Sequence, residues 1–120
     1  MRSADLYVEG GMAAAAELLR RPDRPTAIVT ANDLQALGVY QAARAADLRI
    51  PDQLSVVGFD DLPFVQWLGP ALTTVRQPLM QMGAAAAEMV IGLSVSRRPD
   101  HDRIELPTTL VIRESTAPLR

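Results

Sequence analysis

The middle of the chain alternates strand, helix and strand patterns, and this alternation limits the fold more than any other feature. Residues 26–30, TAIVT, form a short apolar run between turn residues, which is typical of a buried strand. Residues 31–48 repeat apolar side chains at helical spacing, and Asn32 or Asp33 can cap that helix. Residues 54–59, LSVVGF, form a second apolar run. Two strands joined by one helix are expected to be parallel, so the sequence predicts an α/β fold with a largely parallel sheet.

Two more helices are predicted on either side of this unit. Residues 9–25 begin with alanine, leucine and glutamate, which favour a helix, and they end at two prolines. Residues 78–94 begin with a proline, which suits the first turn of a helix. The apolar stripe of this last helix, which we expect to pack in a core, consists of Leu79, Met82, Ala86, Met89 and Leu93.

The remaining strands are short. Residues 71–75, ALTTV, predict a third strand. Residues 103–116 predict two strand segments that are broken at Pro107, because proline cannot pair within a ladder. No internal repeat and no low-complexity linker interrupts this order.

The composition excludes several classes of function. Apolar residues make up 48% of the 120 residues, which is enough to bury a core. The net charge of −2 offers no basic face for nucleic acid. The chain has no cysteine, no lysine and no phosphate-binding glycine loop. Its one histidine, His101, lies among charged residues, as a solvated loop histidine does, so we expect no metal, no cofactor and no catalysis.

We see no targeting segment and no membrane segment in the sequence. The first residues, MRSADLYVEGG, contain an arginine but no apolar region behind it, unlike a signal peptide. Charges interrupt the alanine-rich helices, so no apolar run is long enough to cross a membrane. We therefore expect the chain in the cytoplasm.

Polar residues follow two of the predicted strands at their carboxyl ends. Asn32 comes after the first strand, and Asp60 and Asp61 come directly after the second. In open parallel sheets, ligands bind in the crevice outside these ends. If the two strands are neighbours, Asn32 and Asp60 point into the same crevice.

Several uses of these side chains are open. A general acid–base couple needs a second group across a substrate, and adjacent residues on a turn usually point apart. A magnesium pocket of the receiver type needs a lysine, which the chain lacks. Recognition of a sugar, polyol or nucleoside suits them, because a carboxylate accepts from neighbouring hydroxyls while an amide both donates and accepts. The alternative is structural: Asn32 and Asp33 cap a helix, and Asp60 and Asp61 turn the chain.

Four motifs resemble one protein family. PTAIVTAND, IPDQLSVVGFDD, PALTTVRQP followed by Gly83, and LP with LVIREST occur in this order along nearly the whole chain. They closely resemble the C-terminal part of the effector-binding domain of LacI/GalR-type bacterial transcriptional repressors. The resemblance implies the three-layer, parallel-sheet fold of the type I periplasmic binding proteins, of which this chain holds a part.

The resemblance also implies roles for individual residues. Asn32 matches the family asparagine that hydrogen-bonds the effector, and Asp60 matches the aspartate that binds effector hydroxyls or polar ring atoms. Leu79 matches an apolar residue that reaches the pocket from the other subdomain. Leu6 stands where the family usually has an aromatic residue that stacks on the ligand, and leucine offers no π face. Tyr7 is adjacent, but in an extended segment it faces the opposite way.

A division of the chain into subdomains follows from the same resemblance. Residues 1–75 correspond to the C-terminal subdomain without its first strand, 76–107 to a segment that packs into the N-terminal subdomain, and 108–120 to the returning strand and tail. The DNA-binding headpiece, most of the N-terminal subdomain and the strand with the pocket arginine are absent, as in a truncated repressor. The helix at 79–93 would then lack its usual sheet. We expect this helix to fold back on the partial sheet or to pair with a second copy of the chain. Each large apolar side chain left exposed to water costs about 1.5–3 kcal/mol of stability.

The resemblance further implies a homodimer, because intact family members dimerise side by side. It places the interface at or near Leu34, Leu37, Phe64, Trp67 and Leu68. Large apolar side chains on a polar-edged turn also indicate an interaction surface. The alternative is that Trp67 folds into its own core.

Two functions agree with these observations. The first is the effector-sensing and dimerisation part of an allosteric LacI-type repressor, with a sugar or related polyol as effector. Such a repressor binds operator DNA only through a headpiece that this chain does not contain. The second is the sugar-binding module of a periplasmic receptor that feeds a transporter, which shares the fold but requires a signal peptide. An enzyme is not expected, because the chain lacks lysine, cysteine and a phosphate loop.

Overall fold

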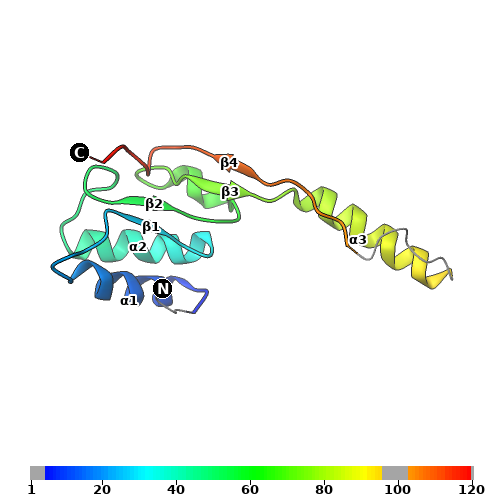
Figure 1. Cartoon of the computed structure of the whole chain (residues 1–120), viewed down its shortest axis with the longest axis horizontal. Helices are drawn as coiled ribbons and strands as arrows, with labels where there is room; N and C mark the ends of the chain where they lie inside the picture. Colours follow the sequence, from blue (N-terminus) through cyan, green and yellow to red (C-terminus); the bar gives the residue numbers. More distant parts are fainter. Residues whose placement is uncertain (1–4, 96–102, 120) are drawn as a thin grey trace. The chain divides into compact units, whose positions relative to one another are not determined.

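The computed structural model describes residues 5–95 and 103–119, and these divide into two compact units. The first unit contains the described residues up to Arg76 together with those from Leu110 onward, and the second unit is Gln77–Thr109. The helices and strands, labelled in Figure 1, are α1 (Val8–Leu19), β1 (Ala27–Val29), α2 (Asp33–Ala45), β2 (Ser55–Val57), the 3₁₀-helix η1 (Pro63–Trp67), β3 (Thr74–Arg76), α3 (Leu79–Ser94) and β4 (Thr109–Val111).

The predicted strand–helix–strand unit is present. β1 and β2 run parallel, with Ile28 opposite Val56, and α2 joins them. Beyond β2 the next segment also runs parallel, through single bridges from Val57 to Thr73 and from Asp60 to Arg76, and β4 pairs with β3. The α/β fold with a largely parallel sheet is therefore confirmed for the first unit.

Helices α1 and α2 pack backbone to backbone. Figure 1 shows α2 beside β1 and β2, with α1 alongside α2. A side chain at Gly11 would collide with the backbone of Gln35, and one at Gly38 would collide with the backbone of Val8 and Met12. Glycine at these two positions lets the helices approach closely, although glycine within a helix is unfavourable by itself.

The hydrophobic core joins α1, α2, β2 and the segments on either side of η1. Each fully buried leucine or valine contributes about 1.5–3 kcal/mol relative to its exposed state. The largest fully buried apolar side chains of the core are Leu54, Leu72, Val39, Val56 and Val65. This core fixes the ends of β1 and β2, where the candidate site lies.

β1 differs from the buried strand that the sequence predicts. It pairs with β2, but Ala27 is exposed and 76% of Val29 is exposed. No second neighbour is paired with β1 within residues 5–95 and 103–119, so this strand forms an edge. The prediction of a buried strand was wrong, because the apolar run alone does not reveal how many strands flank it.

Two predictions for the end of the chain were also wrong. Residues 103–108 form no strand, and of the two expected segments only β4 is present. Pro107 has no N–H to give to a ladder, which explains why the strand begins after it. The apolar stripe of α3 is not in a core: none of its residues is buried, and Leu79 and Leu93 are 62% and 63% exposed. Besides α3, the described residues of the second unit contain no helix, and their only strand residue is Thr109 of β4.

Other expectations can be settled from the described residues. Trp67 is 82% exposed, so it does not fold into its own core. Among the helices in the described ranges, none has the length and apolarity needed to cross a bilayer. His101 lies outside the described residues.

Candidate functional site

The carboxyl ends of β1 and β2 lie next to each other. The Thr30 amide donates to the Val57 carbonyl at 2.9 Å, and the Asp33 amide donates to the Phe59 carbonyl at 2.9 Å. These two bonds place Asn32, at the start of α2, beside the segment that carries Asp60. The adjacency that the sequence suggested is thus present in the first unit.

Asn32 has two structural contacts. Its Oδ1 accepts from the Gln35 amide at 2.9 Å, which caps α2, and its Nδ2 donates to the Leu6 carbonyl at 2.9 Å. The capping role is therefore real. An asparagine amide has two donor hydrogens and two acceptor lone pairs, so one donor and one acceptor position remain for a ligand.

Gln35 supports the same region from the first turn of α2. Its Nε2 donates to the Asp5 carbonyl at 2.7 Å, and its Oε1 accepts from the Ala31 amide at 3.0 Å. Together with Asn32, it holds the segment before α1 against the strand end. Leu6 is 58% exposed there, and Tyr7 is exposed as well.

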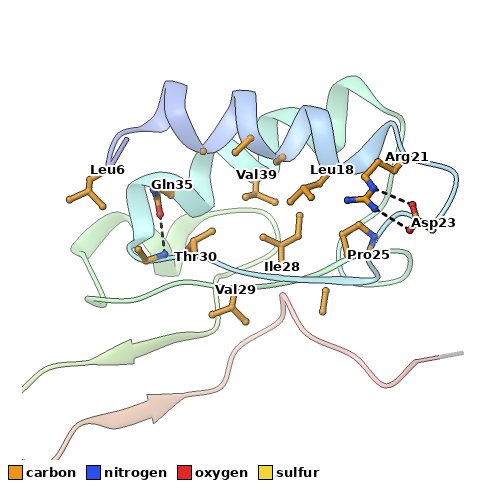
Figure 2. Close-up of a pocket in the computed structure, with 15 residues that line it drawn as sticks. Leu6, Leu18, Arg21, Asp23, Pro25, Ile28, Val29, Thr30, Gln35 and Val39 are labelled. Atoms are coloured by element: carbon orange, nitrogen blue, oxygen red, sulfur yellow. Dashed lines mark hydrogen bonds and ion pairs between the residues drawn. The ribbon is translucent and has the colours of Figure 1, made fainter. Parts of the chain in front are cut away.

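An apolar cavity of about 660 Å³ lies between α1 and β1. Figure 2 shows Leu6, Thr30 and Gln35 at one end and the Arg21–Asp23 ion pair at the other, with Ile28 pointing toward α1. Asn32, Asp60 and Leu79 are not among its lining residues within the described parts of the chain. Sugar sites need several convergent polar groups, so this cavity is a poor sugar site.

The aspartate turn, Asp60–Asp61, has an unusual backbone. Asp60 has φ 120° and Asp61 has φ 58°, both in the region that favours glycine. Such conformations cost on the order of 1–3 kcal/mol each and persist only where the surroundings enforce them. The Asp60 amide donates to the Val75 carbonyl at 2.9 Å, which ties the turn to β3.

Asp61 is held by two arginines. Its Oδ2 accepts from Arg76 Nε at 2.7 Å and its Oδ1 from Arg113 Nη2 at 2.7 Å. Burial by itself would raise the pKa of Asp61, but the hydrogen bonds and charges of both arginines outweigh it, so this pKa lies below its usual value. Asp61 therefore has a structural role in the first unit.

Asp33 is the most enclosed carboxyl group of the site, with 0% exposure. Its Oδ1 accepts from Thr74 Oγ1 at 2.7 Å and its Oδ2 from the Leu62 amide at 2.8 Å. Desolvation by burial raises the pKa of Asp33, and the nearby charges of Asp60 and Asp61 add to this, whereas the two hydrogen bonds oppose it.

The other predicted residues are divided between the two units. Leu79 belongs to the second unit and is 62% exposed. On the first unit, Phe64 and Leu68 pack partly against the core, while Leu34 and Leu37 are partly buried on α2. Trp67 projects from the end of η1 into solvent.

Three polar residues that hold the site were not predicted for these roles. Gln35 stands three residues after the cap Asn32, as in a capping box, and this spacing could have revealed it. Asp33 was considered only as a cap, and nothing in the sequence links Arg113 to Asp61 across 52 residues. No group of three or more acidic, histidine or cysteine side chains in the described ranges is arranged to hold a metal ion.

The first unit is an α/β domain with polar side chains at the carboxyl ends of neighbouring parallel strands, the edge where ligands bind in open parallel sheets. Residues 2–116 match the family model of the periplasmic binding protein-like domain. The chain belongs to this family.

Its relatives and structural neighbours include transcriptional regulators of the LacI type. The chain is 35% identical over 113 residues to the ribose operon repressor of Escherichia coli, covering 94% of this chain and 34% of that protein. It is 43% identical over 110 residues to the regulator MalR of Streptomyces coelicolor, covering 92% of this chain and 31% of that protein. The chain therefore spans about a third of the length of the curated relatives it matches.

Solved structures agree with this assignment. A LacI family regulator from Enterococcus faecalis with bound ribose superposes with a TM-score of 0.89 at 32% identity, covering 98% of this chain and 43% of that one. The dimeric lac repressor gives a TM-score of 0.88 at 30% identity, with the same coverage. The resemblance to the C-terminal part of LacI-type effector-binding domains, and the periplasmic-binding-protein-like fold, are confirmed.

Proposed function

We propose that this chain is the effector-sensing part of a LacI-type transcriptional repressor and that its effector is a sugar or a related polyol. The observation that carries the proposal is the aspartate turn, which stands at the strand ends beside Asn32. Related regulators have been solved with ribose and with lactose bound. A strained, well-supported turn that bears a carboxylate is typical of a binding site.

Each predicted effector residue has a role in this proposal. Asp60 accepts hydrogen bonds from sugar hydroxyls, and Asn32 uses its remaining donor and acceptor positions on the ligand. Leu6, held in place by Asn32 and Gln35, contributes an apolar contact to a ring face. Leu79 contributes a second apolar contact from the segment that follows β3.

The proposed mechanism is a shift between closure states. Residues 1–75 act as the C-terminal subdomain, 76–107 as part of the N-terminal subdomain, and 108–120 as the returning strand. The division into compact units after Arg76 and before Leu110 supports this assignment. An effector that binds one closure state better shifts the population that is competent to bind DNA.

The function is binding without turnover, in the cytoplasm, as a homodimer. Operator DNA would be contacted only through a headpiece outside this chain. The proposed dimer face contains Leu34, Leu37, Phe64, Trp67 and Leu68, and the exposure of Trp67 supports it.

The direct test is Asp60→Ala in the full-length regulator. The wild type should melt at a higher temperature in the presence of its sugar, because a ligand that binds only the folded state stabilises it. We expect Asp60→Ala to lose this shift in a screen of ribose, lactose and related sugars, and to lose sugar-induced release of operator DNA while still binding DNA.

Asp52→Ala is the matched control. Asp52 is exposed and forms only a 3.7 Å pair with Arg49, so its removal should leave the sugar response unchanged. Asp60→Ala with an undiminished sugar response would contradict the role of Asp60. A wild-type protein that responds to no sugar or polyol would contradict the class of effector.

A further inference from the structure

Asp33 brackets the aspartate turn from both sides. Its backbone N–H donates to the Phe59 carbonyl at 2.9 Å, immediately before the turn. Its carboxylate Oδ2 accepts from the Leu62 amide at 2.8 Å, immediately after the turn. One residue, at the first position of α2, thus fixes both ends of the two-residue turn that carries Asp60.

The carboxylate of Asp33 sits in a place shaped for it. Its other oxygen, Oδ1, accepts from Thr74 Oγ1 at 2.7 Å, and both residues are 0% exposed. A side chain at Gly58 would collide with Oδ1, so glycine at that position leaves the space that the carboxylate fills. Both oxygens are thereby satisfied in the interior, as a buried polar group requires.

The turn needs this support because of its backbone. Non-glycine residues with positive φ are stable only when neighbouring contacts over-determine them. Asp60 and Asp61 both have positive φ. Arg76 and Arg113 hold the side chain of Asp61, and the backbone of Asp60 is paired with β3 through Val75. Asp33 bonds the residues on either side of the turn, Phe59 and Leu62.

We propose that Asp33 is the positioning residue of the crevice: through Phe59 and Leu62 it holds the aspartate turn in its positive-φ conformation and so fixes the direction of the Asp60 carboxylate. This inference rests on the proposed function, in which Asp60 binds the effector. Asp33 itself is buried beneath the turn and acts through Asp60 rather than on the ligand.

The charges around Asp33 make this role sensitive to protonation. Asp60 and Asp61 face it from the turn, while Arg76 on β3 and Arg113 after β4 bind Asp61. A protonated Asp33 has a donor on one of its two oxygens, so that oxygen can no longer accept from Leu62 or from Thr74 in the same geometry. Protonation should therefore change the hydrogen bond to Leu62 or to Thr74, although burial favours the neutral form of Asp33 in the folded chain.

Asp33→Asn tests the inference, with Thr74→Val as the matched control. Both variants keep the size of the side chain and remove one hydrogen bond of the buried cluster. Asparagine has only one acceptor oxygen, so it cannot accept from both Leu62 and Thr74. Thr74→Val leaves the Phe59 and Leu62 bonds intact. Nuclear magnetic resonance of the 120-residue chain reports the result at three amides, those of Asp60, Asp61 and Leu62.

In Asp33→Asn we expect the couplings that report positive φ at Asp60 and Asp61 to be lost and the Leu62 amide to exchange faster. In Thr74→Val both should stay as in the wild type. In the full-length regulator, affinity for the sugar that shifts wild-type melting should fall about tenfold in Asp33→Asn, as expected for one lost charge-assisted hydrogen bond, and by less than about twofold in Thr74→Val.

The outcomes separate this inference from the proposed function. Asp33→Asn that keeps the positive-φ couplings and the slow Leu62 exchange would overturn the positioning role, whatever the sugar response is. Loss of the turn in Asp33→Asn, in a protein whose wild type binds no sugar, would support the positioning role and overturn the proposed function. Equal losses of sugar affinity in Asp33→Asn and Thr74→Val would show that Asp33 is only structural.

If Asp33→Asn does not fold, the wild-type chain still gives an answer. The Leu62 amide resonance should titrate together with the Asp33 carboxyl carbon as the pH is lowered. A Leu62 amide that does not follow the titration of Asp33 would overturn the inference.

Discussion

At the scale of single residues, two neighbouring carboxyl groups respond to pH in opposite directions. Burial raises the pKa of Asp33, so the stability linked to this group is fully present below the ordinary carboxyl pKa of about 3.9 and is lost as the pH rises through the folded value. Asp61 is opposite. Its pKa is lowered by Arg76 and Arg113 against the effect of burial, so its contribution is present above about 3.9 and is lost as the pH falls through the folded value.

We predict that Asp61→Asn lowers the free energy of unfolding at neutral pH by about 2–4 kcal/mol, because it leaves a largely buried arginine without its partner. Most of the loss should come from Arg113, whose side chain is 17% exposed, because Arg76 is 56% exposed and screened by solvent. Urea unfolding measures this, and the variant should lose less stability than the wild type on acidification below about pH 4.

Asp23→Asn is the control for this prediction. Asp23 also pairs with an arginine, Arg21, but both side chains are well exposed, so the substitution should leave stability unchanged. An effect of Asp61→Asn as small as that of Asp23→Asn would contradict the structural role of Asp61.

The sequence locates some of these residues and not others. The positions of Asp60 and Asn32 after strands could be predicted, because each follows an apolar run that is typical of a strand. The hydrogen bonds of the Asp33 carboxylate cannot be predicted in the same way. Its partners Leu62 and Thr74 are 29 and 41 residues away, so the contacts exist only after the chain has folded.

At the scale of elements, α1 and α2 pack closely against each other in the first unit. Gly11 and Gly38 each meet the backbone of the opposite helix, so the interhelical distance is set by main-chain contact. The sequence predicts the first helix from its alanine, leucine and glutamate content and the second from apolar side chains at helical spacing. It does not predict which glycines lie at the crossing, because that depends on the angle between the helices.

We predict that Gly38→Ala destabilises the chain by about 1–3 kcal/mol, because the added methyl group collides with the backbone near Val8 and Met12. Gly83→Ala in α3 is the control, since no atom lies within 4 Å of its added methyl group. At position 83, alanine should increase the helicity of α3 and stabilise this helix by up to about 1 kcal/mol. Thermal melts followed by circular dichroism measure both, and a Gly38→Ala protein as stable as wild type would contradict the close packing.

Strand predictions show a similar limit. The runs that became β1 and β2 are correctly placed, although both strands are shorter than their apolar runs. The buried state of β1 and the strand before Pro107 were predicted wrongly, because pairing depends on neighbours that a local pattern does not contain.

At the scale of the whole molecule, the described residues expose several large apolar side chains. Trp67 is 82% exposed on the first unit, and α3 has no buried residue in the second. Isolated exposed apolar residues are common, but a large aromatic residue beside other apolar side chains indicates an interface. The family resemblance could indicate this face in advance, whereas composition alone could not.

We predict that Trp67→Ala weakens self-association of the full-length regulator, because tryptophan is a frequent anchor of protein interfaces. Sedimentation velocity over a range of concentrations should show a dimer for the wild type and a shift toward monomer for the variant. Gln66→Ala is the matched control on the same 3₁₀-helix, since Gln66 is exposed and bonds only to Pro63 within η1. Equal dimer content in both variants would remove Trp67 from the interface.

The edge formed by β1 has a consequence for handling the chain. A strand with one paired side and one open side is a template on which another extended segment can add, and Val29 makes this edge apolar. Short β-rich stretches without charge, such as TAIVT, are also those that stack into ordered fibrils. Concentrated solutions of the isolated chain are therefore expected to convert slowly to β-rich aggregates. The substitution Val29→Lys should delay that conversion.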